Sequence, residues 1–158
     1  MTAERLRVLV AAPYPTVLAG CYDGVSARLV EQAGFHAAHM SGFAVAGSLL
    51  GRPDVGLLTM TEMADAASRI ARVLSIPLLA DADTGYGNAL NVVRTVETYI
   101  AGGVAGMHLE DQQMPKRCGH LAGKTVIPAD EMAGKLRAAI DTREAVGTDI
   151  VIIARTDA

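Results

Sequence analysis

Short apolar runs alternate with amphipathic segments along most of the chain. Each run has the length of a buried strand, and the segments between runs repeat their apolar positions at helical spacing. We expect strands at residues 17–19, 37–40, 78–80, 106–109 and 150–154. Strands separated by helices in this way predict a parallel sheet.

Capping residues and glycines mark the predicted helices. The helices are expected at residues 26–33, where Gly34 is placed to end the helix, at 61–74, after Asn88 and at 130–146. Thr61 and Asn88 are the residue types that cap helix amino ends. Gly102 is placed to end the helix that follows Asn88.

Polar residues that can do chemistry come directly after the predicted strands. Asp81 and Asp83 follow the third strand, Glu110 follows the fourth and Arg155 follows the fifth. The active site of a (β/α)₈ barrel lies at the carboxyl ends of its strands. An open doubly wound sheet also binds ligands there, usually with a glycine-rich phosphate turn. No such turn motif is present, so we predict an α/β fold of the (β/α)₈ TIM-barrel type.

The length of the chain bears on how much of a barrel it can form. The chain has 158 residues and ends just beyond the fifth predicted strand, whereas a complete barrel typically needs about 250 residues. We therefore expect residues 1–158 to be the N-terminal portion of a single barrel domain, truncated after about five β/α units. One sheet edge would then be open.

Composition excludes some classes of function. The net charge is −3 and no run of Lys or Arg occurs, so nothing in the sequence indicates a nucleic-acid partner. No apolar stretch approaches the roughly 20 residues of a membrane span, and no apolar signal core follows the N-terminal charges. We expect a cytoplasmic protein without a membrane partner.

Two aspartates in the segment LADADTGYG form the first candidate site. Residues two apart on a strand point the same way, so Asp81 and Asp83 can converge above the rim of the sheet. Two such carboxylates repel each other unless a cation lies near them. Oxygen ligands suit Mg²⁺, which typically takes one or two carboxylates plus waters. The alternative is a pair of loop or capping aspartates. Glu110 could orient water in the outer shell of the metal.

The segment PKRCGH contains the second candidate site. A thiol such as Cys118, between two cations and His120, is expected to be more reactive than a buried structural cysteine. Gly119 permits a sharp loop, and Lys116 and Arg117 can grip substrate carboxylates. Zinc binding by Cys118 and His120 is the alternative, but it needs two further Cys or His ligands at suitable spacing.

The KRCGH motif resembles the signature of isocitrate lyases and 2-methylisocitrate lyases. Other motifs occur in the order of that family, namely MSG at 40–42, PD at 53–54, DADTGYG at 81–87, HLEDQ at 108–112 and IARTDA at 153–158. From Tyr22 onward, the chain is similar to the N-terminal half of the isocitrate lyase and phosphoenolpyruvate mutase superfamily.

The resemblance implies a role for each motif. Mg²⁺, with Mn²⁺ as a possible substitute, would be held by Asp81 and Asp83, with Asp54 joining through water. The substrate-binding residues implied are Ser41, Gly42, Phe43, Arg117, Gly119 and Arg155. The catalytic residues implied are Cys118, Lys116, His120 and Glu110, with residues 116–120 on a mobile loop that closes over the substrate.

The implied reaction is a retro-aldol-type cleavage of a 2-hydroxy di- or tricarboxylic acid, such as 2-methylisocitrate. Metal binding would lower the hydroxyl pKa of this small-molecule substrate, and Cys118 would protonate the carbanion that leaves. Phe43 stands where many methylisocitrate lyases have glycine, and His39 where an aromatic hydroxyl is expected, so the substrate stays open. The alternatives are a carboxyphosphonoenolpyruvate phosphonomutase, an oxaloacetate decarboxylase and an inactive truncated chain. The resemblance also implies a homo-oligomer, a dimer of dimers, at full length.

Overall fold

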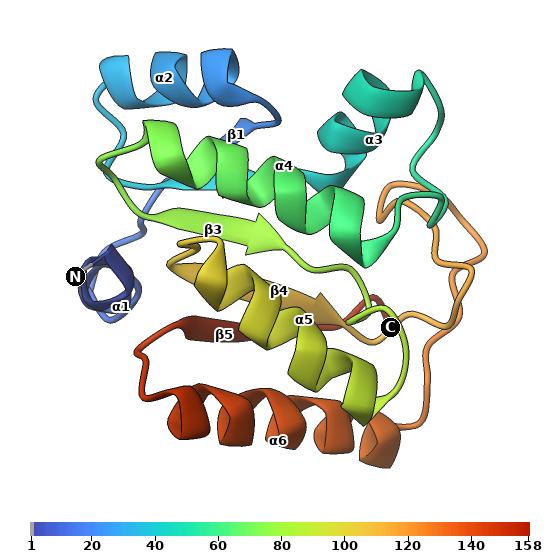
Figure 1. The fold of residues 1–158 in the computed structure, drawn as a ribbon. Helices are drawn as coiled ribbons and strands as arrows, with labels where there is room; N and C mark the ends of the chain where they lie inside the picture. Colours follow the sequence, from blue (N-terminus) through green and yellow to red (C-terminus); the bar gives the residue numbers. More distant parts are fainter. Residues whose placement is uncertain (1) are drawn as a thin grey trace.

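A computed structural model describes residues 2–158, and a five-stranded parallel sheet lies at its centre (Figure 1). The strands are β1 (Ala19–Cys21), β2 (Ala38–Met40), β3 (Leu78–Asp81), β4 (Gly106–Glu110) and β5 (Val151–Arg155). They pair in sequence order, each parallel to the next. A doubly wound sheet reverses its strand order at a switch point. The unbroken order here is that of a barrel wall, as predicted.

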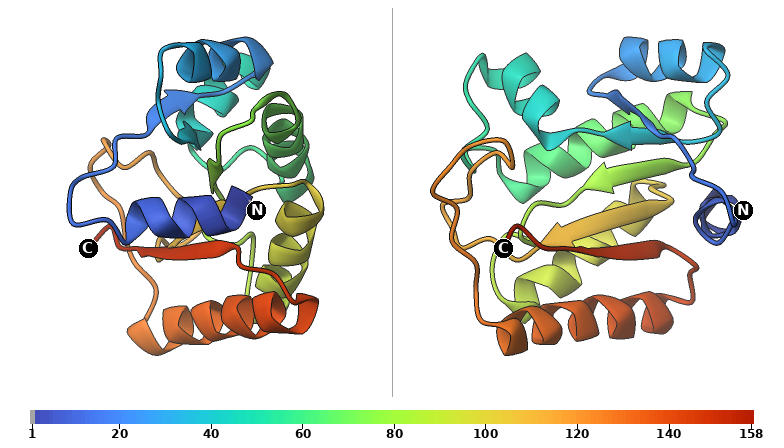
Figure 2. Two further views of the ribbon diagram at one scale, coloured as in Figure 1. Left: turned by 90° about the vertical axis from the view of Figure 1, so that its left-hand side faces the viewer. Right: turned by 180° about the vertical axis from the view of Figure 1, so that it is seen from behind.

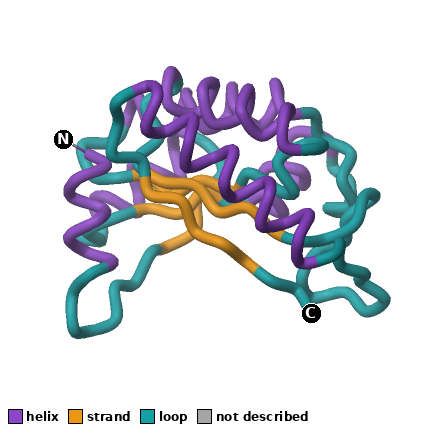
Figure 3. Tube along the Cα trace, turned by 90° about the horizontal axis from the view of Figure 1, so that it is seen from below, coloured by secondary structure: helices purple, strands orange, loops and turns teal. Residues whose placement is uncertain are grey.

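The helices that connect the strands lie together on one side of the sheet (Figures 2 and 3). These helices are α2 (Gly24–Gln32), α3 (Gly42–Leu50), α4 (Met60–Val73), α5 (Ala89–Ala101) and α6 (Ala129–Val146), and a further helix, α1 (Thr2–Val10), precedes β1. The opposite face of the sheet is concave (Figure 3). Of the helices described, none combines the length and apolar character needed to span a bilayer.

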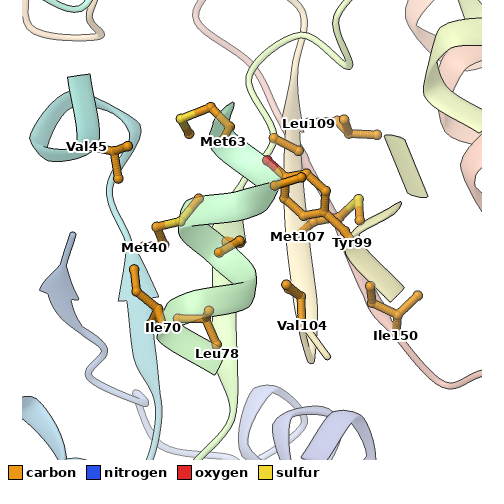
Figure 4. Packing of buried hydrophobic residues seen from close by; sticks show 14 of the residues in the cluster. Met40, Val45, Met63, Ile70, Leu78, Tyr99, Val104, Met107, Leu109 and Ile150 are labelled. Carbon is orange, nitrogen blue, oxygen red and sulfur yellow. The ribbon is translucent and has the colours of Figure 1, made fainter. Parts of the chain in front are cut away.

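The two faces of the sheet differ in polarity. One face is apolar, and on the other face the residues at the carboxyl ends of the strands are polar. Met40, Ala80 and Met107 are register partners and are fully buried against the helices. Met63 and Ile70 of α4 point into the same core (Figure 4). Because side chains alternate along a strand, the intervening positions lie on the concave face, and they include the residues that end β3 and β4.

Helix α1, which was not predicted from the sequence, covers the end of the sheet at which the strands begin. Leu6 is fully buried there in a small cluster with Ala37, Ala105 and Val151. The close fit depends on Gly106, since a Cβ at that position would lie 2.5 Å from the Leu6 side chain. The carboxyl ends of the strands lie at the opposite end of the sheet, away from α1.

Most predicted elements are confirmed, but several boundaries were wrong. Strand β1 begins at Ala19, two residues later than expected. Helix α4 is capped by Thr59 rather than by Thr61, because the Thr59 side chain accepts a hydrogen bond from Glu62 N and the Glu62 carboxylate binds back to Thr59 N. This reciprocal pair is a capping box. Asn88 caps α5 and Gly102 ends it, as predicted.

Candidate active site

The carboxyl end of β3 brings two aspartates together. Asp81 is the last residue of the strand, and its carboxylate accepts hydrogen bonds from Asp83 N at 2.9 Å and Gly42 N at 3.2 Å. Asp83 lies beyond the strand with a φ of 48°, so the expected strand alternation is wrong for this residue. A turn, rather than the pleat, places Asp83 beside Asp81.

The start of α3 lies so close to Asp81 that a side chain on Gly42 would displace the Asp81 carboxylate. A Cβ on Gly42 would lie 2.6 Å from Asp81 Oδ2. Ser41 caps α3 by accepting a hydrogen bond from Ala44 N. Two of the residues predicted to bind substrate, Ser41 and Gly42, therefore lie next to the predicted metal ligand. The Phe43 side chain, the third of the residues in this segment predicted to bind substrate, is 57% exposed.

Lys116 is buried between two aspartates. Its Nζ atom lies 2.7 Å from Asp54 Oδ1 and 2.5 Å from Asp83 Oδ1. Burial disfavours the charged amine, but the charges of the two carboxylates outweigh it and raise the pKa of Lys116 well above its ordinary value. The amine that was expected to grip a substrate carboxylate thus ties the 116–120 segment to the end of β3.

The rest of the KRCGH segment lies on the same rim. Cys118 N donates to the backbone carbonyl of Asp54 at 3.0 Å, and Cys118 Sγ lies 3.5 Å from His120 Nδ1. The Arg117 guanidinium donates to the carbonyl of Ala122 within the same loop. The thiol and the imidazole are therefore in contact, and the loop backbone is fixed to the segment before α4.

Glu110 and Arg155 meet where β4 and β5 end. Arg155 Nη1 lies 3.2 Å from Glu110 Oε2, and Arg155 Nη2 lies 3.0 Å from the Asp157 carboxylate. Burial raises the pKa of Glu110 to about 8, although the charge of Arg155 acts in the opposite direction. A Cβ on Gly119 would lie 2.6 Å from Arg155 Nη2, so the loop packs directly on this arginine.

A histidine pair lies on the concave face below the aspartates. His39 Nε2 and His108 Nε2 are 3.0 Å apart, and the two rings stack. His108 is buried, and its Nδ1 lies 3.7 Å from Asp81 Oδ1. Burial lowers the pKa of both imidazoles. The pairing joins β2 to β4 across β3, and no sequence pattern predicted it.

Sequence reasoning also missed Gln112 and Asp157. Both side chains bind into the Glu110 and Arg155 group: Gln112 Nε2 lies 3.2 Å from Glu110 Oε1 and 3.1 Å from Asp157 Oδ2. A signal was available, because Gln112 is the second residue after Glu110 in the HLEDQ motif and Asp157 is the second after Arg155.

The donor set fits a hard cation held by two carboxylates rather than by three. Within residues 2–158, no three His, Cys, Asp or Glu side chains are gathered closely enough to hold a metal ion. Lys116 contacts both the Asp54 and the Asp83 carboxylates, and Asp81 and Asp83 are the two carboxylates joined at the end of β3. Burial and the charge of Asp81 raise the pKa of Asp83, so a cation beside this pair would relieve its repulsion. One or two carboxylates plus water and substrate oxygens suffice for Mg²⁺.

The family profile described as phosphoenolpyruvate phosphomutase matches residues 6–158. The chain belongs to the phosphoenolpyruvate mutase/isocitrate lyase superfamily. The 2,3-dimethylmalate lyase of Eubacterium barkeri is 48% identical to this superfamily member over 157 residues, which are 99% of this chain and 54% of that protein. The chloroplastic carboxyvinyl-carboxyphosphonate phosphorylmutase of Arabidopsis thaliana is 54% identical over 143 residues, 89% of this chain and 41% of that protein. The chain thus spans about half the length of the curated relatives it matches.

Solved structures of superfamily members have the same fold. Oxaloacetate acetylhydrolase in complex with 3,3-difluorooxalacetate superimposes with a TM-score of 0.94 at 46% identity, covering 99% of this chain and 54% of that chain. Phosphonopyruvate hydrolase in complex with oxalate and Mg²⁺ superimposes with a TM-score of 0.88 at 33% identity, covering 99% and 53%. The five strands and their helices match part of the TIM barrel of these proteins, which confirms the predicted fold class.

Proposed function

We propose that the protein is a Mg²⁺-dependent carbon–carbon lyase that cleaves a 2-hydroxy di- or tricarboxylic acid into a 2-oxo acid and a carboxylate. One observation carries the proposal: the buried Asp81 and Asp83 pair is joined through Lys116 to the loop that bears Cys118. An oxygen-rich cation site and a reactive thiol on one rim are the two parts that this cleavage requires. Relatives named as lyases, at 42 to 48% identity, support the choice.

Asp81 and Asp83 would hold the Mg²⁺, with Asp54 joining through water. When bound, the ion supplies Lewis-acid chemistry to the hydroxyl and adjoining carboxylate of the substrate. Gly42 N is held by Asp81, which fixes the start of α3 and the Ser41 hydroxyl beside the site. Arg155 provides a cation for a substrate carboxylate.

Cys118 acts as the general acid. As the carbon–carbon bond breaks, the electron pair stays on the carbon of the departing carboxylate fragment, and the Cys118 proton is delivered there. The hydroxyl proton passes to a water molecule at the site, and the hydroxyl oxygen becomes the carbonyl of the 2-oxo acid, so one proton leaves from oxygen and one arrives at carbon. His120 lies within reach of the thiol, so it can return a proton between turnovers. Packing of the loop on Arg155 keeps water from the carbanion.

A second candidate is a phosphonomutase of the same superfamily, favoured by the 54% identity to the Arabidopsis thaliana phosphorylmutase. A third is cleavage or decarboxylation of oxaloacetate, favoured by the likeness to oxaloacetate acetylhydrolase. All three reactions use small carboxylic acids, and both solved relatives were bound to such acids. Assembly of the full-length protein into a homo-oligomer belongs to the same proposal.

The test is release of 2-oxo acid by the full-length protein with Mg²⁺ and with EDTA. The substrates are 2-methylisocitrate, isocitrate, 2,3-dimethylmalate and oxaloacetate, with a carboxyphosphono substrate followed in parallel by ³¹P NMR. We expect Mg²⁺-dependent release from one of the 2-hydroxy acids. Release from none of them, with a new phosphorus signal, would establish the mutase instead.

A further inference from the structure

Gln112 is a buried amide whose side chain makes four hydrogen bonds. It is 2% exposed, and its Nε2 donates toward the carbonyl of Arg117 at 2.8 Å, toward Asp157 Oδ2 at 3.1 Å and toward Glu110 Oε1 at 3.2 Å. Its Oε1 accepts from Arg117 N at 2.9 Å. One side chain therefore joins the ends of β4 and β5 to the backbone of the KRCGH loop.

The contacts of Gln112 lie at the base and at the centre of one loop. The base is closed by a bridge between Gln112 and Val126 and by hydrogen bonds from Gln113 N to Thr125 O and from Ile127 N to Asp111 O. The Gln112 side chain reaches past this base to Arg117, next to Cys118. Backbone hydrogen bonds close the base of the loop, and the Gln112 side-chain amide holds the centre of the loop in place.

We propose that Gln112 is the positioning residue that holds the KRCGH loop against the rim. An amide can both donate to the Arg117 carbonyl and accept from the Arg117 N–H, so it completes both polar groups of one loop residue. A glutamate of the same length could only accept, and its charge would lie between Glu110 and Asp157. Loss of a buried partner leaves desolvated polar groups behind, and these are satisfied by water only if the loop leaves the rim.

The role of Gln112 in holding the loop does not depend on which reaction is catalysed, but the effect of this role on turnover rests on the proposed function. If Cys118 is the general acid, a loop released from the rim presents the thiol less often to the reacting carbon. Turnover should then fall more than substrate binding weakens, because the misplaced group acts in the transition state.

The direct test is the rate at which iodoacetamide alkylates Cys118 in the full-length protein, followed by peptide mass spectrometry. Cys118 is partly exposed and Cys21 is fully buried, so Cys21 reports unfolding within the same sample. We expect Gln112→Ala and Gln112→Glu to raise the Cys118 rate about tenfold, which corresponds to about 1.4 kcal/mol of lost loop closure. Cys21 should stay protected.

The matched control is Gln113→Ala. Gln113 is the same residue type at the next position, but its side chain is exposed, and its Oε1 accepts a hydrogen bond from Thr125 Oγ1 within the base of the loop. Its Cys118 rate should stay within twofold of the wild type. An unchanged rate in Gln112→Ala, or parallel labelling of Cys21, would overturn the proposal. Neither result depends on which acid is cleaved, so failure here leaves the proposed function standing.

Discussion

At the scale of single residues, the site depends on contacts that leave no room for a side-chain atom. Gly42 is the clearest case, because its missing Cβ is what lets Asp81 lie against the start of α3. The Asp81 carboxylate is the movable end of a side chain, so an added methyl group should displace it rather than unfold the protein. Function should suffer more than stability.

Gly42→Ala is therefore expected to lower kcat/KM about 10²-fold, the size of effect that a 1 Å misplacement produces. The matched control is Gly47→Ala on the same helix, where a Cβ meets nothing within 4 Å. Gly47→Ala should keep full activity and gain about 0.5–1 kcal/mol of stability, since alanine replaces glycine within a helix. Kinetics and urea unfolding of both variants measure this. Equal kinetics for the two would contradict the role of Gly42.

The sequence locates the acidic and thiol motifs, but it does not separate Lys116 from Arg117. Both are cations on neighbouring positions of one loop, and their local patterns are equivalent. Their difference comes from long-range packing, because Asp54 and Asp83 approach from other segments and bury only Lys116. The same holds for the contact of Gly119 with Arg155.

At the scale of helices and strands, local signals predict well where capping chemistry is unambiguous. Asn88 is the residue directly before α5, and it was correctly predicted as the cap. Two threonines, Thr59 and Thr61, lie near the start of α4, and either could cap the helix. Thr59 is the cap because the Glu62 carboxylate, three residues later, completes a capping box with it. Helix α3 was missed because its sequence, GFAVAGSLL, has no charged residue and no clear helical repeat of polar positions. Helix α1 was missed because its anchor, Leu6, meets residues far along the chain.

The two threonines can be told apart by stability. Thr59→Ala should destabilise the full-length protein by about 1 kcal/mol, because helix α4 loses its cap. Thr61→Ala changes an exposed position within the helix and should stay within about 0.5 kcal/mol of the wild type. Urea unfolding at neutral pH measures both. A larger loss for Thr61→Ala would mean that Thr61 is the cap.

At the scale of the whole molecule, the order of apolar runs was enough to predict a parallel sheet, and the polar residues after the strands were enough to favour a barrel. Strand order and the solved superfamily structures confirm both. Single sequence positions could not predict how the rim is assembled, because it draws on every strand end from β2 to β5 and on the loop that spans them.

The central claim for the molecule is that the aspartate pair binds the metal ion while Cys118 on the loop donates the proton. The most direct test is turnover of Cys118→Ser in the full-length protein, measured beside its binding of Mn²⁺ as a spectroscopic substitute for Mg²⁺. We predict turnover at least about 10²-fold lower, the contribution of a positioned general acid, with Mn²⁺ affinity unchanged. Full turnover in Cys118→Ser, or a loss of Mn²⁺ binding together with activity, would contradict it.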